Sequence, residues 1–355
     1  MGRILLYGAY GFTGQLIARR ARESGFEPVL AGRDPERLAA LGRELGLETR
    51  PFSLEDSIAE ALEDVDVCVN AAGPFVRTAT PMVHACLDTG TDYLDITGEV
   101  AVFSALHGLE SAARDAGVTL LPGVGWDVVP SDCLAAALVS RLPSASELSL
   151  GLAGLGAGRY GGSVSRGTAL SALESTGSGS QVRQNGRLVS VDAGRLTRRI
   201  DFGRGEATTV ALPMGDLVTA PVHTGIQNVT VYVAVPRWAP WALRILDRFG
   251  PVLRSGPVLS GARWLVNRTV DGPDEDELET GEAAVWGEAT DGDSTVTGRV
   301  RTPNPYRFTA TATVRAIERV REGTVAPGFQ TPASAFGAEF GLESPGVDYT
   351  VVDGQ

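Results

Sequence analysis

Three glycines at fixed spacing, Gly8, Gly11 and Gly14, follow the apolar run 4–6 near the start of the chain. The apolar run predicts a short buried parallel strand, and residues 15–21 predict a helix with one apolar face. A strand, a glycine turn and a helix in this order are typical of the first unit of a dinucleotide-binding sheet. We expect Gly8 to take the tight exit from the strand, Gly11 to let a phosphate approach, and Gly14 to bring the helix close to the sheet.

The glycine turn also places unpaired amide groups at the positive end of the helix, where a diphosphate would bind. The spacing is Gly-x-x-Gly-x-x-Gly, and glycine is abundant, with 44 in 355 residues, so the alternative is that these glycines serve turns alone. The position of the turn after the first strand favours the cofactor site. The predicted contacts are Gly8, Tyr10, Gly11, Phe12, Thr13 and Gly14.

The second predicted strand, residues 28–31, leads into Gly32, Arg33 and Asp34. An acid at this strand tip would accept a hydrogen bond from the ribose of NAD, whereas an arginine can pair with the 2′-phosphate of NADP. Arg33 therefore favours NADP, although it can also be a solvated surface charge. Asp34 either reads the ribose or caps the helix that begins at Pro35.

Composition narrows the class of protein. The formal charge of −12 opposes binding to nucleic acid, and no early segment resembles a secretory signal, so we expect a cytoplasmic location. All 31 basic residues are arginine, which excludes a lysine Schiff base and a Tyr-x-x-x-Lys site. The three cysteines, Cys68, Cys86 and Cys133, lack ligand spacing, and we expect no metal site.

Short apolar strands alternate with helical segments as far as residue 121, which predicts a parallel sheet covered on both faces. The strand 65–70 runs into a loop of small residues, where Ala72, Gly73 and Pro74 can lie against the cofactor. Asn70 either binds the cofactor or stabilises this loop.

Beyond residue 121 the alternation stops, and a turn-rich stretch leads into strands that suggest an antiparallel or mixed sheet. The fold class is therefore α/β, with an N-terminal Rossmann-type doubly wound parallel sheet and a second α+β domain. The expected strands of the second domain are 147–153, 227–235, 281–289 and 295–301, with helices at 163–175 and 306–321. The predicted domains are 1–125 for the cofactor, 126–330 for the substrate, and a C-terminal segment, 331–355.

Several motifs occur together in one order, from Gly8–Gly14 through Ala31–Arg33, Asn70–Phe75, Tyr93–Glu99 and Gly125–Asp132 to 215–221 and 328–337. With these motifs the chain resembles the saccharopine dehydrogenase-like oxidoreductases, a family that includes the trans-acting enoyl reductases of bacterial lipid biosynthesis. The resemblance implies an NADP-binding N-terminal domain and a larger second domain. It also implies a final segment that returns to the first domain, with a returning helix at 331–340.

Hydride transfer needs a proton donor near the reduced bond. Glu99 and Asp127 are the first candidates because both lie in glycine-flanked loops, and each can instead cap the helix that follows. Tyr93 is a further catalytic candidate, with core packing as its alternative. His223 is expected in a loop between strands, either as a proton donor or as a solvated side chain.

The stretch 238–268 is apolar but interrupted by arginines, prolines and glycines, which excludes a membrane-spanning helix. A packed helical hairpin is favoured over a lid or a membrane-binding surface. The sequence thus predicts an NADP-dependent oxidoreductase that reduces a C=C (enoyl) or C=N bond of a small hydrophobic, acyl or lipid-like substrate. The alternative is a non-catalytic dinucleotide-binding or lipid-associated scaffold, and a homodimer is left open.

Overall fold

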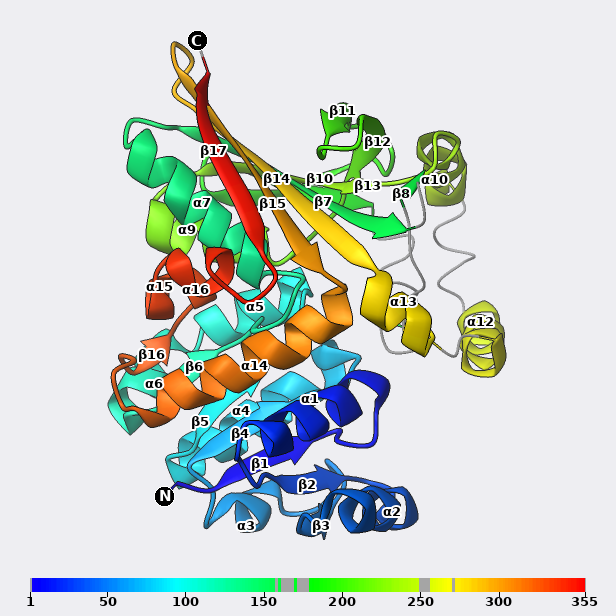
Figure 1. Cartoon of the computed structure of the whole chain (residues 1–355), viewed down its shortest axis with the longest axis vertical. Helices are drawn as coiled ribbons and strands as arrows, with labels where there is room; N and C mark the ends of the chain where they lie inside the picture. Colours follow the sequence, from blue (N-terminus) through cyan, green and yellow to red (C-terminus); the bar gives the residue numbers. More distant parts are fainter. Residues whose placement is uncertain are drawn as a thin grey trace. The chain divides into compact units, whose positions relative to one another are not determined.

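The computed structural model describes residues 2–156, 159–160, 169–170, 179–248, 256–269 and 272–354 (Figure 1). The chain divides into two compact units. The first contains Met1–Asp127 and Tyr306–Phe336, and the second contains Val128–Pro305 and Gly337–Gln355. The first boundary between the units lies after residue 127, whereas the sequence analysis expected it after residue 125.

The first unit contains a parallel sheet of seven strands in the order β16-β6-β5-β4-β1-β2-β3. Its strands are β1 (Ile4–Tyr7), β2 (Val29–Gly32), β3 (Thr49–Pro51), β4 (Val67–Asn70), β5 (Asp92–Asp95), β6 (Thr119–Leu121) and β16 (Gly328–Phe329). The chain moves outward from β1 to β3 and then returns to β4 on the other side of β1. The direction of winding therefore reverses between β1 and β4, and the predicted doubly wound sheet is confirmed.

Six helices connect the first six strands: α1 (Phe12–Glu23), α2 (Pro35–Leu45), α3 (Ile58–Leu62), α4 (Phe75–Thr89), α5 (Val100–His107) and α6 (Glu110–Ala116). Every residue of β1, β2, β4 and β6 is buried, as expected for apolar strands covered on both faces. Glycines end three of these helices in the left-handed conformation: Gly46 after α2, Gly90 after α4 and Gly117 after α6.

The segment that returns to the first unit differs from the predicted one. Helix α14 (Pro305–Arg321) was expected in the second domain, but Thr309 Oγ1 accepts a hydrogen bond from Trp126 N at 3.0 Å, and Thr313 Oγ1 donates to Val124 O at 3.3 Å. Strand β16 then pairs with β6, and α15 (Pro332–Phe336) ends the segment. The returning part is Tyr306–Phe336, and the residues after it belong to the second unit.

The second unit contains a ten-stranded mixed sheet with the main path β10-β9-β13-β7-β14-β15-β17. Strands β13 and β7 are parallel, whereas the other described pairs are antiparallel, so the predicted mixed sheet is confirmed. The strands are β7 (Glu147–Gly156), β8 (Arg159–Tyr160), β9 (Ser180–Gln184), β10 (Arg187–Val191), β11 (Thr197–Asp201), β12 (Glu206–Ala211), β13 (Asn228–Ala234), β14 (Glu282–Thr290), β15 (Thr295–Pro303) and β17 (Asp348–Gly354).

The described helices of the second unit are α7 (Val129–Arg141), α9 (Asp216–Thr224), α10 (Ala239–Arg248), α12 (Gly256–Thr269), α13 (Glu275–Thr280) and α16 (Glu339–Leu342). Helix α7 packs closely on β14 and β15 because both strands carry a glycine beneath it. A Cβ on Gly287 would lie 2.7 Å from Leu138 Cδ1, and a Cβ on Gly298 would lie 2.7 Å from Leu134 Cδ1. Leu134 and Leu138 therefore lie on the face of α7 that packs against the sheet.

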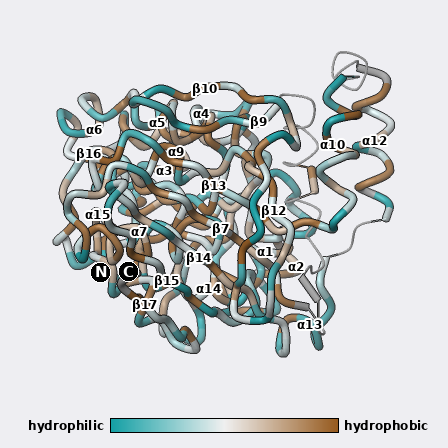
Figure 2. Tube along the Cα trace, turned by 90° about the horizontal axis from the view of Figure 1, so that it is seen from above, coloured by the Kyte–Doolittle hydropathy of each residue, from teal (hydrophilic) through white to brown (hydrophobic). Residues whose placement is uncertain are grey.

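Three local expectations changed in the second unit. His223 lies in α9 and not in a loop, because the helix continues through Pro221. The predicted helix 163–175 lies outside the described residues except for 169–170. In place of a packed hairpin, α10 and α12 expose their tryptophans, and Figure 2 shows apolar residues on both helices. Among the described residues, no helix combines the length and apolar character needed to cross a bilayer.

Candidate functional site

The glycine turn has the tight geometry predicted for it. Gly8 follows β1 with a φ of 82°, and its amide and that of Ala9 donate to Ala31 O of the neighbouring strand. A Cβ on Gly14 would lie only 2.3 Å from Gly8 O. Gly8 is thus needed for its backbone conformation and Gly14 for the close approach of α1 to the turn.

Helix α1 presents its first amides at the end of this turn. Gly11 is the N-cap and makes no side-chain cap, and the first intrahelical bond runs from Gln15 N to Gly11 O at 2.9 Å. The amides of Phe12, Thr13 and Gly14 precede that bond and point toward the positive end of the helix. A Cβ on Gly11 would meet only Gly8 O within 4 Å, so the outer side of the turn has room for a phosphate.

The turn lies at the point where the winding of the sheet reverses. A Cβ on Gly8 would lie 2.8 Å from Ala72 N, so the loop after β1 contacts the loop after β4. In open α/β sheets, ligands bind at this crevice outside the carboxyl ends of the strands. The glycines, the first amides and the crevice together fit a dinucleotide.

The tip of β2 presents Arg33 as an exposed cation. Asp34 is engaged elsewhere, because its Oδ1 accepts from Arg37 N at 3.1 Å and caps α2. Of the two predicted roles for Asp34, the structure therefore favours the cap. Arg33 is left as the charged group at the strand tip, where a 2′-phosphate would lie.

A second arginine, Arg37, was missed by the sequence analysis. Its guanidinium lies 4.5 Å from the centre of the Tyr10 ring and donates to Tyr10 O at 3.2 Å. The Tyr10 ring in turn covers Gly32, where a Cβ would lie 2.7 Å from Tyr10 Cε1. The signal was present in the sequence, since Arg37 follows Arg33 by about one helical turn.

Asn70 stabilises the loop after β4. Its side chain is buried, donates to Thr78 Oγ1 at 3.1 Å and to Tyr93 OH at 3.2 Å, and accepts from Ala72 N at 3.0 Å. Both ends of the amide group are engaged within the unit. These bonds favour the loop-stabilising alternative over a direct contact with the cofactor.

Tyr93 and Asp95 form a buried pair at the carboxyl end of β5. The phenol of Tyr93 donates to Asp95 Oδ2 at 2.9 Å, and Asp95 Oδ1 also accepts from Thr97 N and Gly123 N. Burial and the adjacent Asp95 raise the pKa of Tyr93 well above its ordinary value, and burial raises the pKa of Asp95 to about 6. Both side chains are fully enclosed, so the core-packing alternative fits Tyr93 better than the catalytic role.

Glu99 caps the neighbouring helix α4. Its Oε1 accepts from Phe75 N at 3.1 Å and its Oε2 accepts from Val76 N at 2.9 Å. These are among the first amides of α4, whose N-cap, Pro74, makes no side-chain cap. A carboxylate in this position stabilises the positive end of the helix, and protonation would cost one of the two bonds.

Asp127 differs from the other acids at this edge. It is half-buried against the loop after β5, where a Cβ on Gly98 would lie 3.1 Å from Asp127 Cβ. Burial raises the pKa of its carboxyl to about 6. Among the described residues its carboxylate has no hydrogen-bond partner, unlike the carboxylates of Asp95 and Glu99.

The second unit contains another pair of titratable groups. His223 Nε2 of α9 lies 2.9 Å from Asp132 Oδ1 of α7, and Asp132 is fully buried. Burial alone would lower the pKa of His223, but Asp132 more than offsets this effect and the pKa lies above its ordinary value. Arg183, which is close to α9 in this unit, donates to Leu217 O and Gly186 O.

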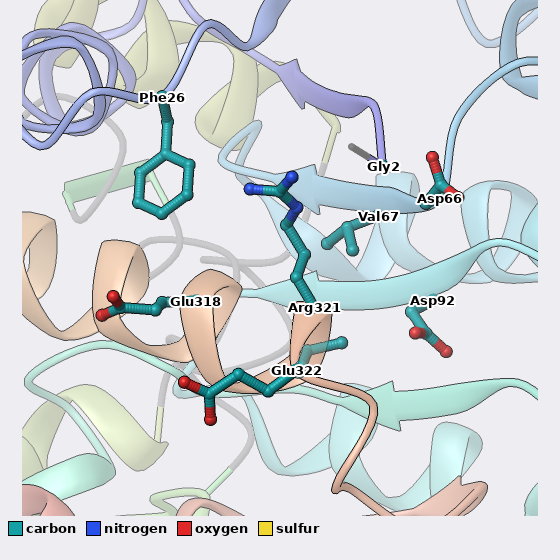
Figure 3. A pocket seen from close by; sticks show the side chains of 9 residues that line it. Gly2, Phe26, Asp66, Val67, Asp92, Glu318, Arg321 and Glu322 are labelled. Carbon is teal, nitrogen blue, oxygen red and sulfur yellow. The ribbon is translucent and has the colours of Figure 1, made fainter.

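A cavity of about 560 Å³ in the first unit lies away from the predicted cofactor site (Figure 3). Its lining includes Gly2, Asp66 and Asp92, which stand at the amino ends of β1, β4 and β5, and Arg321 of α14. Dinucleotides bind at the opposite, carboxyl ends of such strands. This cavity is therefore not the predicted nucleotide site.

Comparison with known families agrees with the geometry. Residues 4–121 match the family described as the saccharopine dehydrogenase NADP binding domain, which covers the first six strands. The match confirms the predicted NADP cofactor and the resemblance noted from the motifs. The residues that would contact NADP remain predictions.

Relatives and a solved structure extend the comparison. A trans-acting enoyl reductase of Mycobacterium tuberculosis is 35% identical over 143 residues, which is 36% of this chain and 33% of that protein. One of Mycobacterium ulcerans is 34% identical over 139 residues, again 36% of this chain and 33% of that protein. The match thus spans about a third of the length of these relatives.

The fold of the whole chain is similar to that of saccharopine dehydrogenase (L-Glu forming) from Saccharomyces cerevisiae in its apo form. The TM-score is 0.68, with 16% sequence identity and 100% of both chains covered. The similarity confirms the fold class over both units.

Proposed function

We propose that this chain is an NADP-dependent oxidoreductase of the saccharopine dehydrogenase-like family that reduces a C=C or C=N bond in a hydrophobic or acyl-type substrate. The observation that carries the proposal is the glycine turn at the reversal point of the sheet, in a domain that matches an NADP-binding family. The relatives named as enoyl reductases favour a C=C bond.

The residues of the first unit suit the parts of the cofactor. The amides of Phe12, Thr13 and Gly14 would hold the diphosphate, and Arg33 would pair with the 2′-phosphate. The loop Ala72–Pro74 would flank the nicotinamide half, held in place by Asn70. NADPH supplies the hydride when bound, so the protein must position the substrate and deliver a proton.

Asp127 is the proposed proton donor. Its raised pKa keeps a fraction of the carboxyl protonated near neutral pH, which a general acid requires. Glu99 and Tyr93, the other predicted catalytic residues, are engaged in a helix cap and a buried pair. We therefore assign them the role of holding the loops on either side of Asp127.

NADPH consumption with a panel of substrates tests the function. The panel contains α,β-unsaturated acyl thioesters and imines formed from 2-oxo acids and amines. The reaction is monitored by the loss of NADPH absorbance. We expect turnover of the enoyl thioesters, with the Gly11→Val variant as the control that lacks cofactor. Tight NADPH binding without turnover of either class would instead support the non-catalytic scaffold. A cytoplasmic location and a homodimer stay predictions of the sequence.

A further inference from the structure

Three tryptophans of the second unit are exposed to solvent. Trp238 is 69% exposed, Trp241 is 68% exposed and Trp264 is 62% exposed. The chain has only five tryptophans, so most of them lie on the surface. Large aromatic side chains in this state mark interaction sites when they cluster with other exposed apolar residues.

Helix α10 has one side covered by the protein and one side exposed to solvent. A Cβ on Gly194, in the turn between β10 and β11, would lie 2.3 Å from Pro240 O and 3.2 Å from Leu243 Cβ, so these residues mark the covered side. Trp238 and Trp241 are three residues apart and lie together on the other side of the helix. Burial of α10 against the turn therefore leaves both indoles outward.

Helix α12 also carries exposed apolar side chains. Trp264 and Leu265 are exposed, and Val258 lies two turns earlier with 42% exposure. The guanidinium of Arg268 lies 5.6 Å from the centre of the Trp264 ring. An arginine above an exposed indole keeps a cation beside the apolar surface. We call the exposed apolar side chains of these two segments, marked by Trp238, Trp241 and Trp264, the tryptophan face.

The charge of this part of the chain is opposite to that of the whole. The described residues 237–248 and 256–269 contain five arginines and one aspartate, a formal charge of +4, whereas the whole chain carries −12. An anionic surface would therefore attract this stretch and repel the rest of the protein, which orients the tryptophan face toward it.

We propose that the tryptophan face binds the surface of an anionic phospholipid bilayer. Indoles sit at the headgroup level of bilayers, where their rings are apolar and their N–H groups remain hydrated, and arginines pair with lipid phosphates. A twofold dimer through the same face would bring two stretches of charge +4 together, which opposes a second copy as the occupant. The inference goes beyond the reductase function, and it reverses the packed hairpin favoured by the sequence because the indoles are exposed.

Vesicle binding tests the proposal with the full-length protein. Sedimentation with phosphatidylcholine vesicles is compared with vesicles that also contain phosphatidylglycerol, at low and high KCl, and the indole emission is recorded. We expect binding to the anionic vesicles alone, weakened by salt, with a shift of the emission to shorter wavelength. The double variant Trp238→Ala and Trp241→Ala should lower the partition at least about tenfold.

Two double variants with the same change in charge, one beside the tryptophan face and one elsewhere, distinguish binding through this surface from an effect of total charge. Arg237→Glu with Arg248→Glu should also lose about tenfold in partition, whereas Arg20→Glu with Arg22→Glu should bind as the parent does. Arg20 and Arg22 lie in the last turn of α1, with side chains that are 43% and 45% exposed. Circular dichroism checks that each variant is folded.

Three results would overturn the proposal. The first is the absence of binding to anionic vesicles by the folded parent protein at low salt. The second is an equal loss in both charge-reversed pairs. The third is a dimer in sedimentation velocity that the tryptophan variant dissociates while vesicle binding is unchanged, since the face would then bind a second copy.

Discussion

The two halves of the carboxyl edge of the first sheet use their polar groups in different ways. At the ends of β1 and β2, the amides of Phe12 to Gly14 and the cation of Arg33 face outward. At the ends of β4 and β5, the side chains of Asn70, Asp95 and Glu99 are engaged with the protein itself. One half is arranged for an external ligand and the other holds its own loops.

This difference shows why a polar residue at a strand end does not by itself mark a site. Buried side chains satisfy their hydrogen bonds internally, and only a group left with unused capacity can act on a ligand. Asp127, in the loop after β6 next to the second half, retains such capacity and has a raised pKa. The predictions below test whether the division between the two halves is real.

The largest effect is expected from Gly11→Val. The added side chain would occupy the open outer side of the turn, where a phosphate must approach the first amides of α1. NADPH affinity should fall by at least about 100-fold, which corresponds to roughly 2.7 kcal/mol. Calorimetric titration with NADPH measures the loss, and a folded variant with unchanged affinity would refute the role of the turn.

Gly14→Ala is the contrasting substitution. Its Cβ would lie 2.3 Å from Gly8 O, so the backbone of the turn must shift. We expect weaker NADPH binding together with a loss of thermal stability larger than that of Gly11→Val, whose Cβ would lie 3.1 Å from the same Gly8 O. If the two variants behaved alike in both measurements, the glycines would serve folding alone.

Asp127→Asn should lower kcat/KM by about 100-fold while NADPH affinity is retained, since general acid catalysis contributes a factor of this order. The parent rate should fall as pH rises through about 6, because the pKa of Asp127 lies there and only the protonated carboxyl can donate. The variant cannot ionise at this position, so its pH–rate profile should lose this limb. A profile with the same limb in both proteins would assign the proton to another group.

Arg33→Ala should weaken NADPH binding by about 10- to 100-fold and leave NADH binding nearly unchanged, because the arginine pairs with the 2′-phosphate that only NADPH carries. Arg43→Ala is the control, because Arg43 lies in the last turn of the following helix α2, where its Nε donates to Ala39 O. Titration of both cofactors against both variants measures the selectivity. Equal losses for NADPH and NADH would place Arg33 outside the phosphate site.

Much of the fold of the first unit could be predicted from local sequence. The glycine spacing, the apolar strand runs and the helix-ending glycines act within a few residues, so the chain order predicts the sheet. The path of Tyr306–Phe336 could not be predicted in this way. Its pairing with β6 and its hydrogen bond with Trp126 join positions that are far apart in the chain. The motif resemblance implied a return but placed it at later residues.

The site was predicted in part for the same reason. Sequence could name Glu99 and Asp127 as loop acids, but it could not show that Glu99 reaches the amides of Phe75 and Val76, which come from another loop. The exposure of Trp238 and Trp241 likewise depends on how α10 packs against Gly194. The sequence showed an apolar stretch interrupted by arginines without showing which of its side chains are covered.

The smallest effect is expected from Glu99→Gln, and it separates the two loop acids. A glutamine can accept one of the two amide bonds but presents its NH₂ to the other, so helix α4 loses part of its cap. The protein should lose about 1 kcal/mol of stability, measured by urea unfolding, and keep turnover within about twofold of the parent. A fall in turnover equal to that of Asp127→Asn, at unchanged stability, would instead make Glu99 the proton donor and remove the distinction drawn between the two halves of the edge.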